Sequence, residues 1–376
     1  MNEKVTTHIA SLLEDLSYPL DRARSLSPWC YTSSEVFATE IERLVRTGWI
    51  SVARSADLAA PGDWKVVESC GERILLVRNG RGVIKALSPA CRHKWAQIAQ
   101  GSGNTRAFVC PYHRWTYDLD GHLRGAPFID LKCLSAEQKQ LGEFGAEEWQ
   151  GWIFVNLDGQ ADGFGGRLRE IDEVVRPWRL AELLPLFPPL RFEGSYNWKT
   201  LCDNVGESYH VIGTHPKSIL PYANLDGSRW HTDGKSWCRS DVPSGVRRLN
   251  GLAGATLASS VDDFIGTWTY NIYPFHIFGL VEDFVVWQRM DVRGPGEMTM
   301  ELTVLVTPET LIADGIEEFT EEIRNSVIDI ENEDQAAFAL SFLGQNASGA
   351  KRGSFSRYEE GTLHFQRWWA NAMLRC

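Results

Sequence analysis

Two pairs of metal-binding side chains lie close together in the first third of the chain. Each pair combines one cysteine with one histidine, as Cys91-x-His93 and Cys110-x-x-His113. Two Cys and two His can bind a structural zinc ion, but zinc sites usually begin with a Cys-x-x-Cys pair. A [2Fe–2S] centre with two cysteines on one iron and two histidines on the other requires mixed pairs of this kind. The spacing therefore favours an iron–sulfur cluster over zinc.

A second pair of histidines, His210 and His215, follows in the segment 203–215, which reads DNVGESYHVIGTH. A mononuclear iron that activates O₂ is typically bound by two histidines and one carboxylate, which leave coordination positions open. In a chain that already has a candidate redox cluster, this pair indicates such an iron site.

The third ligand of that site is expected on a later helix. A carboxylate on the apolar face of a helix is costly to bury unless it is paired or bound to a metal, and Asp334 is the next inward position after an apolar stripe. Asp329, which points away from the stripe, is the second choice. A helix-capping role for Asp334 after Asn332 is the alternative without a metal. The stripe consists of Phe319, Ile323, Val327 and Ile330.

The composition is that of a globular protein with an excess of acidic residues. A length of 376 residues suggests two domains, and 43% apolar residues allow a sizeable core. The 38 basic and 49 acidic residues give a net charge of −11, which disfavours nucleic acid as a partner. We expect no membrane segment and no signal peptide, because long apolar stretches are missing. The cysteines outside the two pairs show no disulfide framework, so a reducing cytoplasm is expected.

Short strands dominate residues 46–158, which we predict to form a small all-β domain. Loops on a rigid scaffold commonly carry ligands, so both Cys/His pairs are expected in loops at the tip of this domain. The predicted strands cover 73–78, 83–87 and 152–157, with turns at Asn79-Gly80 and Asp120-Gly121.

The flanking regions have a different pattern. Residues 1–45 are predicted to form a helical arm that packs on the catalytic domain, with Ser34 as a helix cap. Residues 159–376 begin with a Gly-rich linker at 160–166 and are predicted to contain an antiparallel sheet. Its strands are expected at 267–277, 284–290 and 298–306, followed by a long helix that begins after Pro308 and runs to about Leu343, and by a C-terminal helix. Four residues are considered for the substrate pocket: Tyr270, Phe275, His276 and Trp287.

The run from Cys91 to His113 and the pattern Asn-x-x-Glu-x-Tyr-His-x4-His resemble the catalytic α subunit of the Rieske non-haem iron oxygenases. The resemblance extends from about Tyr31 to the final helix. It implies an α+β fold in which an all-β Rieske [2Fe–2S] domain is inserted into a helix-grip catalytic domain with an antiparallel sheet. It implies these cluster ligands: Cys91, His93, Cys110 and His113. It also implies His210 and His215 as ligands of a mononuclear Fe(II), and Glu333-Asp334 matches the family's late Glu-Asp pair.

The resemblance also assigns roles to Glu207 and Asn204 in the catalytic machinery. In the family, an acidic residue at the position of Glu207 links an iron-ligating histidine to a cluster histidine of the neighbouring subunit in a head-to-tail homotrimer. Members that act on quaternary ammonium compounds, such as carnitine and glycine betaine monooxygenases, resemble this chain in having Glu there. The alternative is that Glu207 only orients His210.

The implied function is that of a mono- or dioxygenase that oxidises a small organic substrate with O₂. A partner reductase with flavin and iron–sulfur centres would supply electrons from NAD(P)H. The expected reaction is monooxygenation with C–N cleavage of a quaternary ammonium compound, and hydroxylation of an aromatic acid is the alternative. Two other classes are an electron carrier that lacks the mononuclear iron and a zinc-binding module, which would be colourless.

Overall fold

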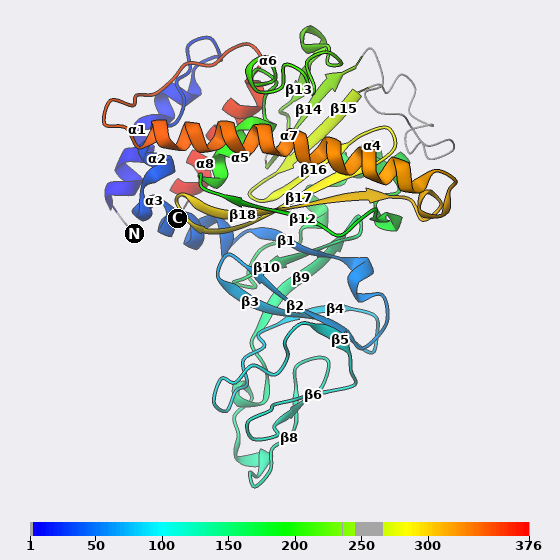
Figure 1. Cartoon of the computed structure of the whole chain (residues 1–376). Coiled ribbons are helices and arrows are strands. Elements are labelled where there is room, and N and C mark those ends of the chain that lie inside the picture. Colours follow the sequence, from blue (N-terminus) through cyan, green and yellow to red (C-terminus); the bar gives the residue numbers. More distant parts are fainter. Residues whose placement is uncertain (1–2, 235, 245–265, 376) are drawn as a thin grey trace. The chain divides into compact units, whose positions relative to one another are not determined.

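The computed structural model describes residues 3–234, 236–244 and 266–375, so Cys376 lies outside the described residues. The chain divides into two compact units. Val45–Glu173 form one unit, and Met1–Leu44 together with Val174–Cys376 form the other, so the first is inserted into the sequence of the second (Figure 1). The first is built from strands and the second from helices and an antiparallel sheet, which confirms the predicted α+β fold.

The inserted unit contains a seven-stranded antiparallel sheet in the order β1-β10-β9-β4-β3-β2-β5. A small three-stranded sheet, β6-β7-β8, adjoins the two Cys/His pairs in the sequence. The bounds of the strands are β1 Trp49–Arg54, β2 Asp63–Ser69, β3 Glu72–Arg78, β4 Ile84–Leu87, β5 Ser102–Asn104, β6 Phe108–Val109, β7 Thr116–Tyr117, β8 Leu123–Gly125, β9 Glu143–Trp149 and β10 Trp152–Asn156.

The inserted unit extends beyond residue 158, the end that the sequence predicts for the β domain. Phe164 stacks on Phe154 with ring centroids 3.9 Å apart. The indole N–H of Trp49 donates to the carbonyl of Asp162 at 2.9 Å. These contacts attach the Gly-rich segment 160–166 to the sheet, so it packs against this unit instead of forming an extended linker.

The turn between β3 and β4 differs from the predicted two-residue hairpin. The side-chain oxygen of Asn79 accepts from the backbone N–H groups of Arg81 and Val83, both at 3.0 Å. The left-handed residue is Gly82, with φ +79°, rather than Gly80. The side chain of Asn79 therefore stabilises a longer loop, an Asx-type arrangement that competes with the tighter turn.

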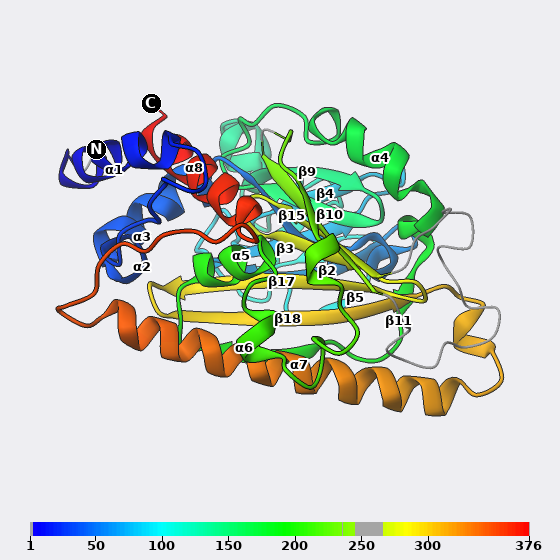
Figure 2. The same ribbon diagram turned by 90° about the horizontal axis from the view of Figure 1, so that it is seen from above.

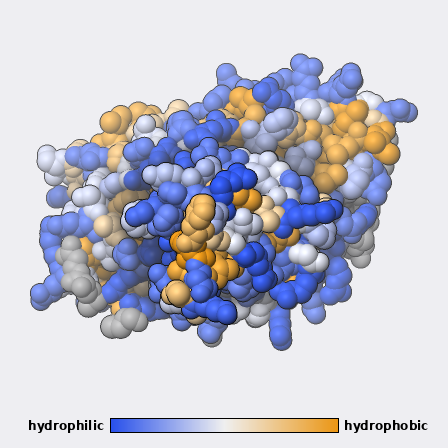
Figure 3. All heavy atoms as spheres, turned by 90° about the horizontal axis from the view of Figure 1, so that it is seen from below, coloured by the Kyte–Doolittle hydropathy of each residue, from blue (hydrophilic) through white to orange (hydrophobic). Residues whose placement is uncertain are grey.

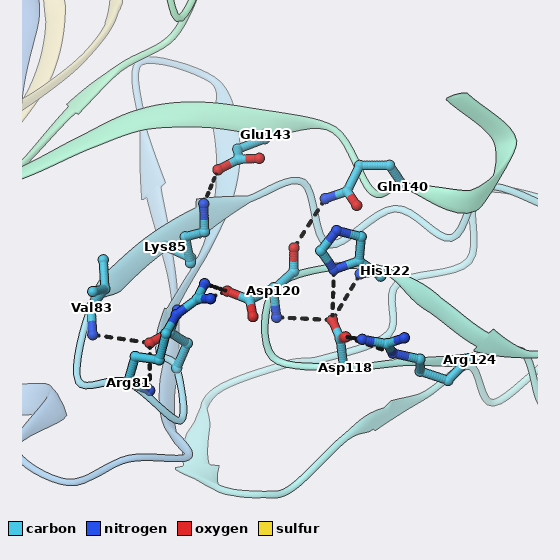
Figure 4. A network of polar contacts seen from close by, with 10 residues as sticks. Arg81, Val83, Lys85, Asp118, Asp120, His122, Arg124, Gln140 and Glu143 are labelled. Atoms are coloured by element: carbon cyan, nitrogen blue, oxygen red, sulfur yellow. Dashed lines mark hydrogen bonds and ion pairs between the residues drawn. The ribbon is translucent and has the colours of Figure 1, made fainter. Parts of the chain in front are cut away.

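A polar network connects this loop to the turn that follows the second Cys/His pair (Figure 4). Asp120 accepts from Asn79 at 2.7 Å and from Arg81 at 3.3 Å. Its carbonyl accepts from the side chain of Gln140 at 3.0 Å. Gly121 has φ +85°, and a Cβ atom there would lie 2.9 Å from the Gln140 amide nitrogen, so the predicted Asp120-Gly121 turn requires glycine. These contacts join the loop between β3 and β4 to the turn at Asp120-Gly121.

The second unit contains an eight-stranded antiparallel sheet within the described residues, in the order β11-β18-β17-β16-β15-β14-β13, with β12 also paired to β18. Helix α7 runs alongside β17 and β18 in both ribbon views (Figures 1 and 2). The strand bounds are β11 Leu184–Pro185, β12 Leu190–Gly194, β13 Arg229–His231, β14 Trp237–Pro243, β15 Gly266–Ile272, β16 His276–Leu280, β17 Val285–Gly294 and β18 Glu297–Val306. The helix bounds are α1 Glu3–Ser17, α2 Trp29–Thr32, α3 Ser34–Glu40, α4 Arg169–Val175, α5 Trp198–Val205, α6 Val211–Thr214, α7 Ile316–Gln345 and α8 Glu360–Leu374.

Two sequence predictions for this unit require correction. The run 267–277 is not one strand, because β15 ends at Ile272 and β16 begins at His276. Pro274 lies between them, and proline cannot donate to a strand ladder. The cap of α3 is Ser33 rather than Ser34, because the Ser33 hydroxyl accepts from the backbone N–H groups of Glu35 and Val36.

A buried ion pair joins the N-terminal arm to α5. The Lys199 ammonium lies 2.5 Å from a Glu40 carboxylate oxygen, and neither side chain is more than 2% exposed. Glu40 also accepts from the indole N–H groups of Trp198 and Trp369 at 3.0 and 2.7 Å. The ammonium lies within 5.2 Å of the ring centroids of Trp198, Trp369 and Tyr31. The arm is thus fixed to the unit through a fully paired charge.

Glu40→Gln is expected to destabilise the protein strongly, because it leaves the Lys199 ammonium buried without a countercharge. Breaking one partner of a buried pair costs about 3–5 kcal/mol. The matched control is Glu35→Gln on the same helix. Glu35 pairs with Lys4 at 2.9 Å and is 44% exposed, so its loss should cost at most about 1 kcal/mol. Urea unfolding midpoints measure both, and equal shifts would contradict the prediction.

Candidate metal centres and the adjoining cavity

The two Cys/His pairs lie in loops with the same backbone hydrogen bonds. In the first loop, residues 91–96, the N–H of Trp95 donates to the carbonyl of Cys91 at 2.9 Å, and the N–H of Cys91 donates to the carbonyl of Ala96 at 3.0 Å. In the second loop, residues 110–115, the corresponding bonds from Arg114 to Cys110 and from Cys110 to Trp115 measure 3.1 and 2.8 Å. Trp95 and Arg114 occupy the left-handed region, with φ 58° and 62°. The sequence spacing did not reveal this repeat.

The two loops separate the ligand types. Cys91 and Cys110 belong to the core of the inserted unit, together with Trp115 and Tyr117. The Tyr117 hydroxyl lies 3.3 Å from the Cys91 sulfur. Burial raises the pKa of the Cys91 thiol, and the neighbouring Cys110 thiol adds to this effect. A thiolate here consequently depends on positive metal charge for its stability.

The two imidazoles lie together on the outer side of the loops. The Nδ1 atoms of His93 and His113 are 3.1 Å apart. The ring of His93 stacks on Trp115 at 5.1 Å with an angle of 5° between the planes. Two buried sulfurs and two adjacent imidazole nitrogens, each supplied in equal numbers by the two loops, fit a [2Fe–2S] centre of the mixed kind.

The second candidate centre brings together His210, His215 and Asp334. One ligand atom from each lies within 4.8 Å of the others. The Nε2 atom of His215 is 3.1 Å from the Asp334 carboxylate, and the Nε2 atom of His210 is 4.0 Å from the same oxygen. Short helix α6 separates the two histidines, and α7 presents the carboxylate from its inward face. His215 is fully buried and Asp334 is 8% exposed.

Each histidine of this group has its Nδ1 atom within hydrogen-bond distance of a carboxylate, which accepts the proton of an Nδ1–H group. The Nδ1 atom of His210 lies 2.7 Å from Glu207, which also accepts from the His210 backbone N–H at 2.9 Å. The Nδ1 atom of His215 lies 2.7 Å from Glu333, which also accepts from the Ser218 hydroxyl. Such bonds fix the tautomer and leave both Nε2 lone pairs for a metal. The sequence suggested the contact of Glu207, but it did not suggest those of Glu333 and Ser218.

Of the two other residues predicted for this centre, Asn204 lies beside Asp334 and Asp329 lies away from it. The side-chain amide of Asn204 lies 3.4 Å from Asp334. Asp329 is exposed and lines an open groove of about 540 Å³ beside Lys217 and Glu322. Burial lowers the pKa of His215, but the bonds and charges of Asp334 and Glu333 outweigh it, so the pKa is raised. The two carboxylates therefore favour positive charge at this point.

Two known domain families match two consecutive parts of the chain. The Rieske [2Fe–2S] domain matches residues 48–135. The catalytic domain of the ring-hydroxylating α subunit matches residues 178–375, more than half of the chain. The chain belongs to the Rieske non-haem iron oxygenases. It is therefore an enzyme of a family that uses a [2Fe–2S] cluster and a mononuclear iron.

Known relatives of this oxygenase include a carnitine monooxygenase subunit and a putrescine hydroxylase. It is 30% identical over 279 residues to the carnitine monooxygenase oxygenase subunit of Acinetobacter baumannii, covering 72% of each chain. It is 27% identical over 362 residues to the putrescine 2-hydroxylase of Ralstonia nicotianae, covering 91% of this chain and 94% of the relative. The crystal structure of a quaternary ammonium Rieske monooxygenase with an inhibitor superimposes with a TM-score of 0.83 at 22% identity, covering 96% and 98% of the two chains. This superposition establishes the shared fold.

The oxygenase has a cavity of about 280 Å³ between the sheet and α7. Its walls include Thr267 and Val286 from the sheet and Val327 and Ile330 from α7. Since successive side chains of a strand alternate between faces, the neighbours Trp268 and Trp287 point to the opposite face.

The aromatic residues considered for the pocket are not in this cavity. The register pairs Tyr270 with Phe278 and Phe278 with Trp287, and Ile272 with His276. This places Tyr270, His276 and Trp287 on the sheet face away from α7, and Phe275 packs on Trp198 at 4.9 Å. Aromatic content alone does not show which face of a strand a residue occupies, so a role of these four residues in substrate binding stays a prediction.

Proposed function

We propose that this oxygenase oxidises a small cationic amine, specifically a quaternary ammonium compound, by monooxygenation and C–N cleavage. The observation that carries the proposal is the cavity between the sheet and α7, because carboxylates line it as well as apolar groups. Glu282 and Asp283 contribute to its wall beside Tyr222 and Phe284. Carboxylates and aromatic faces attract a cation that has no N–H to donate. The carnitine monooxygenase and putrescine hydroxylase among the relatives are consistent with this substrate class.

We assign the mononuclear Fe(II) to His210, His215 and Asp334, and the cluster to Cys91, His93, Cys110 and His113. The iron would supply O₂ activation, and the cluster would supply electrons to it. Glu207 and Glu333 hold the histidine rings in place, while Asn204 donates to Asp334.

The reaction balances with one external reductant. One oxygen atom enters a C–H bond of the carbon attached to the cationic nitrogen, and the other leaves as water. Two electrons from NAD(P)H and two protons complete this step. The C–N bond of the hydroxylated compound then breaks: the amine leaves with the electron pair of that bond, the hydroxyl group loses its proton to solvent, and the carbon becomes an aldehyde. The electrons require a partner reductase, which we expect to carry flavin and iron–sulfur centres.

We propose a head-to-tail homotrimer in which the cluster of one subunit serves the iron of the next. The surface around the cluster loops supports a docking role, since Trp95, Tyr112 and Phe128 are exposed large side chains there. Viewed from below, hydrophobic residues gather among hydrophilic ones at the end nearest the viewer (Figure 3). In this assembly Glu207 would reach a cluster histidine of the partner subunit as well as His210.

We propose a cytoplasmic location. None of the seven cysteines among the described residues forms a disulfide, and several of them are buried, which suits a reducing compartment. Among the described helices, none is long and apolar enough to span a membrane.

A substrate panel tests the proposed reaction. The enzyme, reconstituted with both metals and a compatible reductase, should consume O₂ with carnitine, glycine betaine or choline and release the corresponding amine. Stoichiometric amine and aldehyde would establish C–N cleavage. Substrate-dependent O₂ uptake and hydroxylated product from an aromatic acid alone would instead establish the alternative function. A protein with zinc and no labile sulfide would contradict both.

A further inference from the structure

One buried and one half-buried polar residue, Glu331 and Gln288, lie between the cavity and the iron-site carboxylate, and neither belongs to the predicted site. On α7, Val327 lines the cavity, Glu331 lies one turn further and Asp334 lies one turn beyond it. Residues three and four apart share a helix face, and all three are buried. Glu331 is therefore on the line from the cavity to Asp334.

The sheet continues in the same direction. Val286 lines the cavity, and Gln288 is the next residue of β17 on the same face. The side-chain amide of Gln288 donates to the Glu331 carboxyl at 2.8 Å. This hydrogen bond joins the sheet to α7 next to the wall residues Val286 and Val327, on the side toward Asp334 in the sequence of α7.

Glu331 is in an environment that accommodates a cation. It is 6% exposed. Burial and the nearby Asp334 charge raise the pKa of Glu331 to about 8, against the effect of the Gln288 bond. An isolated buried carboxylate is costly, and a nearby positive charge removes much of that cost. The charge of Asp334 itself would be used by the iron.

The proposed reaction requires positive charge close to the iron. Because the oxidised carbon is bonded to the cationic nitrogen, that nitrogen must lie one bond from the reacting atom. A quaternary nitrogen has no N–H group, so only a countercharge and surrounding contacts can recognise it. A second positive charge beside Fe(II) would be repelled unless an anion lies nearby.

We propose that Glu331, oriented by Gln288, is the specificity-determining residue that recognises the cationic nitrogen of the substrate beside the iron site. This inference rests on the proposed function, because it names the group that would select that substrate class. Its chemistry differs from that of the iron ligands, since Glu331 contributes charge to substrate binding and no bond to the metal.

Glu331→Gln tests the inference, because it removes the charge and keeps the size. The probes are two pairs of equal shape: choline with 3,3-dimethylbutan-1-ol, and glycine betaine with 3,3-dimethylbutanoate. In each pair a tert-butyl carbon replaces the cationic nitrogen. Calorimetry on the anaerobic enzyme with both metals measures the dissociation constants. The variant should bind the cations about 10- to 100-fold more weakly, whereas its affinity for the uncharged-carbon isosteres should change less than about threefold.

Three further variants control the experiment. Glu321→Gln makes the same change at an exposed position of α7 and should leave every affinity unchanged. Glu331→Asp retains the charge and should retain the preference for the cation. Gln288→Leu removes the orienting bond and should reduce that preference. Iron and sulfide contents are measured for each variant.

The outcomes separate the two proposals. If the wild type prefers the cations and Glu331→Gln keeps the same preference with full iron, the inference is wrong and the proposed function stands. If the wild type shows no preference for the cations, the substrate class is wrong, and the inference is overturned with it. If Glu331→Gln does not fold or loses iron, Gln288→Leu decides, because an unchanged preference in that variant overturns the inference.

Discussion

Asp334→Ala should remove the mononuclear iron, leave the [2Fe–2S] cluster intact and lower turnover by a factor of about 1000 or more, because an open metal site supplies several kcal/mol of activation. The three ligand atoms of this centre lie within 4.8 Å of one another, and Asp334 contributes the negatively charged one. The two loops with the Cys/His pairs, residues 91–96 and 110–115, contribute no residue to this centre. The expected result is a loss of one iron per chain with unchanged acid-labile sulfide.

Asp329→Asn is the matched control. Asp329 lies on the same helix but is exposed, in the groove that also includes Lys217 and Glu322. This variant should retain both metals and near-normal turnover. Metal analysis and the electron paramagnetic resonance signal of the reduced cluster distinguish the two proteins. If Asp329→Asn lost the iron while Asp334→Ala kept it, the third ligand would be Asp329.

The candidate ligands could be predicted from the sequence because their spacing is local. Cys91 and His93 share one turn, as do Cys110 and His113, and short helix α6 connects His210 to His215. Asp334 follows from the period of one helix, which places it on the face of Phe319, Ile323 and Val327, all buried. Local chain geometry accounts for each pair and for the inward position of Asp334 on α7, whereas the contact between Asp334 and His215 spans 119 positions.

The surroundings of the ligands could not be predicted in this way. Glu331 resembles any other acid on a Glu-rich helix, and its partner Gln288 lies 43 positions earlier on a strand. The stripe alone suggested Ile330, which is only half-buried, because a helix face is wider than a single row of residues. Glu333 contacts His215 across 118 positions. Such contacts depend on how α7 lies over the sheet, and periodicity carries no information on that.

Glu207 has two interpretations that the geometry within one chain does not separate. It bonds to the backbone and ring of His210, which would suffice to orient that ligand. In the proposed trimer it would also connect His210 to a cluster histidine of the next subunit. The two roles predict different results when cluster and iron are supplied by different chains.

Co-expression of two inactive variants provides the test. Cys91→Ala retains the iron site without a cluster, and His210→Ala retains the cluster without iron. In randomly mixed head-to-tail trimers, about one quarter of the interfaces pair an intact iron with an intact neighbouring cluster, so about one quarter of wild-type turnover should return. Transfer within a single chain predicts that no turnover returns, although both cofactors are present.

Glu207→Gln then shows whether Glu207 is needed for electron transfer from the cluster of one subunit to the iron of the next. Placed in the Cys91→Ala chain, beside the working iron, it should abolish the recovered turnover while iron and sulfide contents stay constant. Placed in the His210→Ala chain, where the iron site is already lost, it should have no effect, and this is the matched control. A loss of iron from the first combination would assign Glu207 to orienting His210 alone. An equal loss of turnover in both combinations would mean that the substitution damages the assembly, and the bridging role would be wrong.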